Sequence, residues 1–247
     1  PFNMVPDKYR KPFEDMPLEK LLGRPNVDLE SKGANTRTAI NSVRDYFAMI
    51  YGIDENFGRL LKTIDEQGLA DSTIVVFTSD HGEMMGSQDR MHKNLWYAES
   101  FGIPLVIRYP GKVKPRRDDL LIGVPDMMPS LLALMGLEDS IPTGVEGKNL
   151  SAAILGDSPD AERPDSVFYF TMPPIQKFRG NRGLKTDRYT LAILRDGGNR
   201  PDRVYLYDDI NDPYQLKNIA TEQPEVVKKL TKRMHEWMDK TGDEWER

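Results

Sequence analysis

The stretch TIVVFTSDHGEMMGSQDRMHKNLWY, residues 73–97, decides how this chain is interpreted. Residues 73–78 are β-formers without a charge, which is typical of a strand covered on both faces. The run stops at Ser79-Asp80-His81-Gly82, and Lys93 follows later in the same stretch. Ligands of open α/β sheets bind beyond the carboxyl ends of strands, so this position predicts a functional site.

Asp80 and His81 are candidate ligands of a divalent cation, because a carboxylate and an imidazole can both coordinate one. Gly82 would let the backbone turn sharply beneath them. The competing interpretation is structural: Asp80 caps the following segment and His81 is a partly buried residue with its hydrogen bonds made. By local sequence alone Lys93 is a solvated lysine, and Met84, Met85 and Met91 are packing residues.

The surrounding pattern predicts an α/β sheet. Apolar residues recur at intervals of three and four across residues 41–67, which indicates a long amphipathic helix ending at Gly68. Residues 103–109 predict a second covered strand, and residues 125–135 a helix with Asp126 as its cap. Because strands and helices alternate in this way, we expect a mixed sheet with flanking helices.

A smaller antiparallel sheet is predicted after about residue 158. Residues 166–170, 189–194 and 203–207 are short β-rich runs between turns that contain Gly, Asn and Asp. Residues 224–240 carry one apolar helical face, with Pro224 in the first turn and Gly242 past the end. We therefore predict an α/β catalytic part over residues 1–157 and a small α+β subdomain over residues 158–247.

Composition narrows the classes of partner. The chain has 247 residues, 38% hydrophobic and 30% charged, with a net charge of −5. Arg116-Arg117 is followed at once by Asp118-Asp119, so we expect no nucleic-acid partner. No apolar run reaches the roughly 18 residues that a membrane span needs. Cysteine is absent, which excludes disulfides and thiolate metal sites. The Pro-rich residues 1–25 predict a surface loop lying on another element.

Five segments, taken together, resemble the sulfatase family within the alkaline-phosphatase-like superfamily. The resemblance covers essentially the whole chain, and the order and spacing of the segments match. The segments are YFAMIYGIDENFGRLLKTIDEQGL, GLADSTIVVFTSDHGEMMGSQDRMHKNLWYAESFGIPLVIRYPGKV, GVPDMMPSLLALMGL, RGLKTDRYTLAIL and VYLYDDINDPYQLKNIA. The fourth resembles a pair of strands in the family's C-terminal part.

The resemblance implies a hydrolase of sulfuric esters with one divalent cation, calcium first, with magnesium, manganese or zinc as alternatives. Asp80 and His81 match the later pair of metal ligands. Lys93 matches the lysine that contacts the sulfate oxygens and stabilises the leaving group, which makes it a catalytic and substrate-binding residue. The substrate would be a sulfated small molecule or sugar. The family also implies a periplasmic, secreted or lysosomal location.

The chain departs from the family pattern in one important respect. Sulfatases make their formylglycine nucleophile from Cys or Ser in a C/S-x-P-S/A-R motif, and the chain contains no such motif. It also lacks the early Asp-Asp pair of metal ligands. We therefore expect the chain to be the C-terminal half of a sulfatase that works with its own N-terminal half. Alone it should be inactive, bind metal weakly and expose an apolar face on the long helix or the strand at residues 73–78.

Two alternatives remain open at this point. A phosphonate monoester hydrolase or phosphodiesterase of the same superfamily would end a strand in the same Asp-His pair. Those members of the superfamily that use two zinc ions need further histidines before the Asp-His pair, and the chain has none before His81. The other alternative, from a different class, is a catalytically silent fragment that acts only by docking to a partner.

Overall fold

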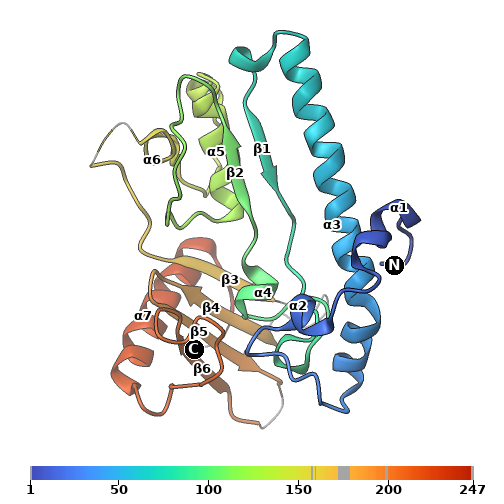
Figure 1. Cartoon of the computed structure of the whole chain (residues 1–247). Coiled ribbons are helices and arrows are strands. Elements are labelled where there is room, and N and C mark those ends of the chain that lie inside the picture. Colours follow the sequence, from blue (N-terminus) through green and yellow to red (C-terminus); the bar gives the residue numbers. More distant parts are fainter. Residues whose placement is uncertain (1, 157, 159, 172–178, 198–199, 246–247) are drawn as a thin grey trace. The chain divides into compact units, whose positions relative to one another are not determined.

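The computed structural model describes residues 2–156, 158, 160–171, 179–197 and 200–245 (Figure 1). Its contacts divide the chain into two compact units, Pro1–Pro110 and Gly111–Arg247. The predicted domain boundary at residues 157/158 stays a prediction, since these units are defined by contacts and not by independent folding. In the described part of the chain, no helix has the length and apolar character needed to cross a bilayer.

A long helix, α3 (Ala34–Glu66), organises the first unit. It starts earlier than its apolar periodicity predicts, and its first half buries Ala39 and Val43 completely. Two short helices, α1 (Asp7–Arg10) and α2 (Leu18–Leu22), lie against it (Figure 1). The expectation of a surface loop over residues 1–25 is therefore incomplete. Tyr9, Leu21 and Leu22 bury their side chains, because apolar residues in a short helix gain by covering α3.

The predicted strands are present and pair with each other. Strand β1 (Val75–Thr78) runs antiparallel to β2 (Leu105–Arg108), with Val75 opposite Arg108 and Thr78 opposite Leu105. The short helix α4 (Ala98–Phe101) precedes β2. Among the residues that the structure describes, β2 is not covered on both faces, since its Val106 is 59% exposed.

Large apolar side chains are also exposed on the second half of α3. Ile50, Ile53 and Leu60 are 45%, 51% and 52% exposed. The sequence predicts such an apolar face for this chain by itself, and the structure confirms it. Several large exposed apolar side chains on one helix are typical of a contact with another element or chain.

In the second unit, α5 (Val124–Leu134) and α6 (Ser151–Leu155) lie side by side. Asp126 caps α5 as predicted, but from inside the first turn: its Oδ2 accepts the Gly123 N–H at 2.8 Å. Its Oδ1 accepts the Lys148 N–H at 2.8 Å, which fastens the following loop to the helix start.

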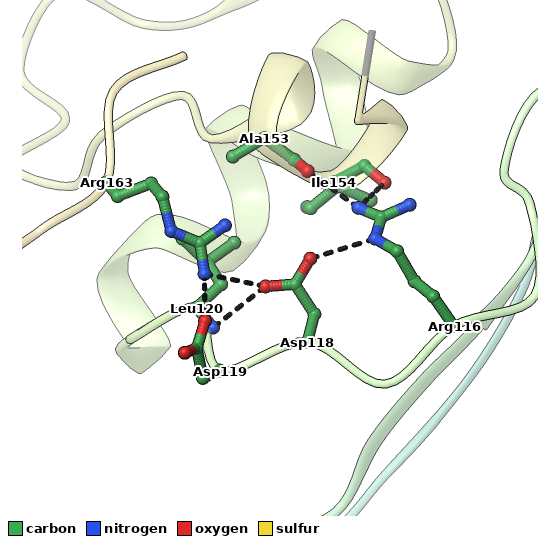
Figure 2. A network of polar contacts seen from close by, with 7 residues as sticks. All are labelled: Arg116, Asp118, Asp119, Leu120, Ala153, Ile154 and Arg163. Atoms are coloured by element: carbon green, nitrogen blue, oxygen red, sulfur yellow. Dashed lines mark hydrogen bonds and ion pairs between the residues drawn. The ribbon is translucent and has the colours of Figure 1, made fainter. Parts of the chain in front are cut away.

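A polar network joins the segment after β2 to α6 (Figure 2). Asp118 accepts from Arg116 at 2.9 Å and from Arg163 at 2.7 Å. Arg116 also donates to the carbonyls of Ala153 and Ile154, both at 2.7 Å. The positive charges of Arg116 and Arg163 are thus paired within the fold.

The small antiparallel sheet has the order β3-β4-β5-β6. Turn patterns predict three of its strands, and the fourth was expected from the resemblance of RGLKTDRYTLAIL to a strand pair. Its strands are β3 (Val167–Thr171), β4 (Gly180–Lys185), β5 (Tyr189–Arg195) and β6 (Arg203–Asp208), and the helix α7 (Pro224–Thr241) follows them. Short 3₁₀ turns lie elsewhere in the chain, at Lys11–Phe13, Ala70–Ser72, Ser87–Asp89 and Glu138–Ser140. The apolar face of α7 packs on β4 and β5 through Leu230, Met234 and Met238.

A buried arginine fixes the segment after α7 to this sheet. The Arg182 side chain is 1% exposed and pairs with Asp243 through Nε at 2.5 Å and Nη2 at 3.1 Å. Its guanidinium lies 5.1 Å from the Trp245 ring centre and 5.4 Å from that of Phe170. A buried charge requires such a partner, because transfer out of water is costly.

Candidate metal and sulfate site

Asp80 and His81 lie together immediately after β1, as the sequence predicts. The Asp80 Oδ1 accepts the His81 backbone N–H at 2.9 Å, and the Asp80 Oδ2 lies 3.4 Å from the His81 Nε2. Their side chains are 84% and 39% exposed. Both groups are therefore accessible to a ligand, and their side chains converge.

The orientation of the His81 ring follows from one backbone contact. His81 Nδ1 lies 2.8 Å from the Gly82 carbonyl oxygen. A carbonyl can only accept, so this hydrogen bond requires the proton on Nδ1. In the neutral imidazole Nε2 then carries a lone pair, and it faces the Asp80 carboxylate.

Gly82 is needed because two backbone segments approach each other closely. A Cβ at this position would lie 2.0 Å from the carbonyl oxygen of Glu99. The Gly82 N–H donates to the Ser100 carbonyl at 2.9 Å. The start of α4 thus supports the turn that carries the two candidate ligands.

The donor set fits a divalent cation. The Nε2 lone pair and the Asp80 Oδ2 are both acceptors 3.4 Å apart, a spacing that two ligands of one ion can have and that a proton or cation stabilises. The described residues contain no group of three or more His, Cys, Asp or Glu side chains placed to hold a metal. The pair therefore forms part of a coordination shell.

Lys93 is exposed and forms no hydrogen bond or ion pair with the residues that the structure describes. Its neighbours His92 and Asn94 both have a left-handed backbone, with φ of 66° and 71°. In the described structure no hydrogen bond or ion pair joins Lys93 to Asp80 or His81. Its role in sulfate binding stays a prediction.

Sequence reasoning missed the contacts that hold the loop between β1 and α4. Arg24 Nη2 donates to the carbonyls of Met84 and Met85 at 3.2 and 3.4 Å. Asn26 Nδ2 donates to Glu99 Oε1 at 2.6 Å. These partners lie 60 to 73 positions apart in the sequence, so no local pattern predicts that they meet. The methionines pack as predicted: Met84, Met85 and Met91 are all buried.

Comparison with known proteins gives the family. The sulfatase family pattern matches residues 2–137, and the pattern described as the C-terminal part of N-sulphoglucosamine sulphohydrolase matches residues 86–242. The chain belongs to the sulfatase family. Its fold is correspondingly the alkaline-phosphatase-like α/β fold with a small antiparallel sheet and a C-terminal helix.

Individual relatives agree with this assignment. An endo-4-O-sulfatase of Bacteroides thetaiotaomicron is 42% identical over 245 residues, covering 94% of this chain and 47% of the relative. An ulvan-active sulfatase of Formosa agariphila is 34% identical over 99% of this chain and 47% of the relative. A solved B. thetaiotaomicron structure, described under metabolism of multiple glycosaminoglycans, matches with a TM-score of 0.90 and 40% identity over 99% of this chain and 52% of that one. The chain thus spans about half the length of these relatives.

Proposed function

We propose that this chain belongs to a sulfuric ester hydrolase that acts on a sulfated saccharide. Family membership supports the reaction class, and the two relatives above are named as sulfatases. One of them is named for the saccharide ulvan, and the matching solved structure for glycosaminoglycan metabolism. In this proposal the chain supplies part of the metal and sulfate site.

The observation that carries the proposal is the convergence of His81 Nε2 and Asp80 Oδ2 at 3.4 Å after β1. Their hydrogen bonds to Gly82 and to the His81 backbone fix both groups before any ligand arrives. A fixed pair of ligands loses little conformational freedom on binding an ion. Both side chains also remain accessible to solvent, as ligands of a metal ion must be before it binds.

Each residue has a defined role in the proposed reaction. Asp80 and His81 would hold the divalent cation, which when bound supplies positive charge against the sulfate oxygens. Lys93 would place an ammonium near the same oxygens and stabilise the charge that develops on the leaving group. The formylglycine nucleophile and the remaining metal ligands would come from outside this chain, in its own N-terminal half.

The identity of the cation is also a proposal. Calcium is expected from the family, yet it prefers an all-oxygen shell, and the imidazole of His81 is more typical of zinc or manganese. Titration calorimetry with calcium, magnesium, manganese and zinc would decide between them. The isolated chain should bind each weakly, without micromolar calcium affinity, because it offers a fraction of the six or more ligands that calcium takes.

Variants connect the binding to the site. Asp80→Asn and His81→Gln should each abolish the weak binding of the best metal, while Asp71→Asn, an exposed acid in the Ala70–Ser72 turn, should leave it unchanged. Unchanged binding in both site variants would contradict the proposed ligands.

Activity is measured on the protein that carries both halves. It should hydrolyse a sulfated saccharide and turn over an aryl sulfate faster than a phenylphosphonate monoester. The opposite preference would favour the phosphonate hydrolase. No turnover of any ester by the metal-loaded protein, with intact binding of the chain to a partner, would favour the docking fragment. A periplasmic, secreted or lysosomal location stays a prediction.

A further inference from the structure

The loop that carries Lys93 has an unusual backbone. Several of its non-glycine residues have a positive φ: Met85, Gln88, Asp89, His92 and Asn94. Each left-handed residue other than glycine costs about 1 kcal/mol or more, so such a loop keeps its shape only if contacts compensate.

Glu83 makes those contacts at the position next to Lys93. Its Oε1 accepts the backbone N–H of His92 at 2.6 Å and that of Met85 at 3.2 Å. The N–H of Met84 donates to the His92 carbonyl at 2.9 Å. Both backbone polar groups of His92 are therefore paired with residues 83–84. A carboxylate acceptor makes hydrogen bonds about twice as strong as a neutral one.

The beginning and middle of the loop are fixed separately. Arg24 holds the carbonyls of Met84 and Met85, and the Asp89 carboxylate is bonded to Thr36 of α3. Glu83 lies two residues after His81 and directly before Met84, whose carbonyl Arg24 holds in place. It transfers that rigidity to His92, nine residues further along the chain.

We propose that Glu83 is a positioning residue: it holds the left-handed backbone at His92 and so fixes Lys93 for the reaction. This rests on the proposed role of Lys93 as the residue that contacts sulfate. Glu83 itself does not touch the substrate. An ammonium on a flexible four-carbon stem stabilises a developing charge poorly unless its backbone is fixed.

The first test measures loop order in the chain itself. Limited trypsin digestion is followed by mass spectrometry of the peptide that ends at Lys93. Glu83→Ala should raise the rate of cleavage after Lys93 at least about tenfold, because local opening exposes the backbone to the protease. Glu83→Gln, which keeps an acceptor oxygen, should give an intermediate rate. Glu14→Ala, an exposed glutamate in the same unit, is the control and should cleave as wild type.

The unfolding midpoint of each variant shows whether a higher rate reflects global unfolding. If Glu83→Ala unfolds, the test is made on Glu83→Gln instead, by measuring the hydrogen exchange of residues 84–94. An unchanged rate after Lys93 in a folded Glu83→Ala variant, or exchange equal to wild type in Glu83→Gln, overturns the proposal.

The second test is a double-mutant cycle in the protein that carries both halves. Glu83→Ala should lower kcat about 10- to 100-fold with a smaller change in KM, and should have no further effect in a Lys93→Ala background. An equal loss in both backgrounds shows that Glu83 acts by another route and overturns the proposal. If Lys93→Ala alone leaves kcat unchanged, the proposed function of Lys93 fails instead, while the digestion result still reports on the loop.

Discussion

The carboxylate of Asp89 caps the helix α3 through Thr36, which lies 53 residues earlier in the chain. Its Oδ1 accepts from the Thr36 hydroxyl at 2.9 Å and from the Thr36 N–H at 3.2 Å. The N-cap residue of α3, Gly33, has no side chain of its own to do this, and a Cβ there would lie 2.5 Å from the same oxygen. The loop after β1 and the first turn of α3 therefore depend on each other.

Replacing Asp89 tests this dependence. Asp89→Ala should lower the free energy of unfolding by about 1–2 kcal/mol, the cost of losing an N-cap acceptor. Asp89→Asn should cost less, because its amide oxygen can still accept and asparagine tolerates the φ of 50°. Urea denaturation measures both. Equal stability of Asp89→Ala and wild type would show that the contact contributes nothing.

Gly82 should not tolerate any side chain. Gly82→Ala places a Cβ 2.0 Å from the Glu99 carbonyl oxygen, so the turn beneath Asp80 must move. We expect a loss of stability of about 3 kcal/mol or more, at the upper end for single substitutions. Gly58→Ala is the control: it lies in α3 with no atom within 4 Å of its Cβ position and should stabilise the helix by about 1 kcal/mol.

Lys93→Ala should lower kcat of the protein carrying both halves by about two to three orders of magnitude, as when one transition-state charge stabiliser is removed. Its melting temperature should change little, because the side chain is exposed and unpaired among the described residues. Steady-state kinetics on an aryl sulfate and a thermal scan test the two statements. A kcat within about threefold of wild type would identify Lys93 as a surface residue.

Asp118 should make stability depend on pH in acid. A hydrogen bond from Arg163, the larger cause, and one from Arg116 lower the pKa of its carboxyl to about 2. Its stabilising contribution is complete above the unfolded pKa near 3.9 and is lost as the pH falls toward about 2.

Asp118→Asn should therefore lower stability at pH 7 and flatten its fall between about pH 4 and 2. The effect should be about 1 kcal/mol or less, since the pair is partly exposed to solvent. Asp139→Asn, an exposed acid elsewhere in the same unit, is the control for lost charge. Identical acid profiles for Asp118→Asn and wild type would contradict this account.

The exposed apolar side chains of α3 predict that the isolated chain associates with itself. Ile53→Lys together with Leu60→Lys should shift it toward monomer in light scattering at high concentration, because both side chains are about half exposed. A wild-type chain that stays monomeric at the same concentration would contradict the prediction.

The sequence was sufficient wherever one segment determines its own structure. The sequence predicts α3 from the spacing of its apolar residues and the Asp80–His81 pair from its place directly after a strand, because both patterns lie within one short segment. The start of α3 was missed because its cap, Asp89, lies in a distant loop. The hydrogen bond from the His92 N–H to Glu83 was missed for a similar reason. Residue propensities do not predict the path of a loop in which several residues other than glycine have a left-handed backbone.

The buried Arg182 determines where the chain can be shortened or extended. A stop codon after Gly242 removes Asp243 and Trp245 and leaves a guanidinium inside the sheet without its carboxylate and with one aromatic neighbour fewer. Breaking a buried pair in this way costs about 3–5 kcal/mol, so a clone trimmed to the end of α7 would be strongly destabilised. Expression vectors should retain Trp245 and place any purification tag behind a spacer after it.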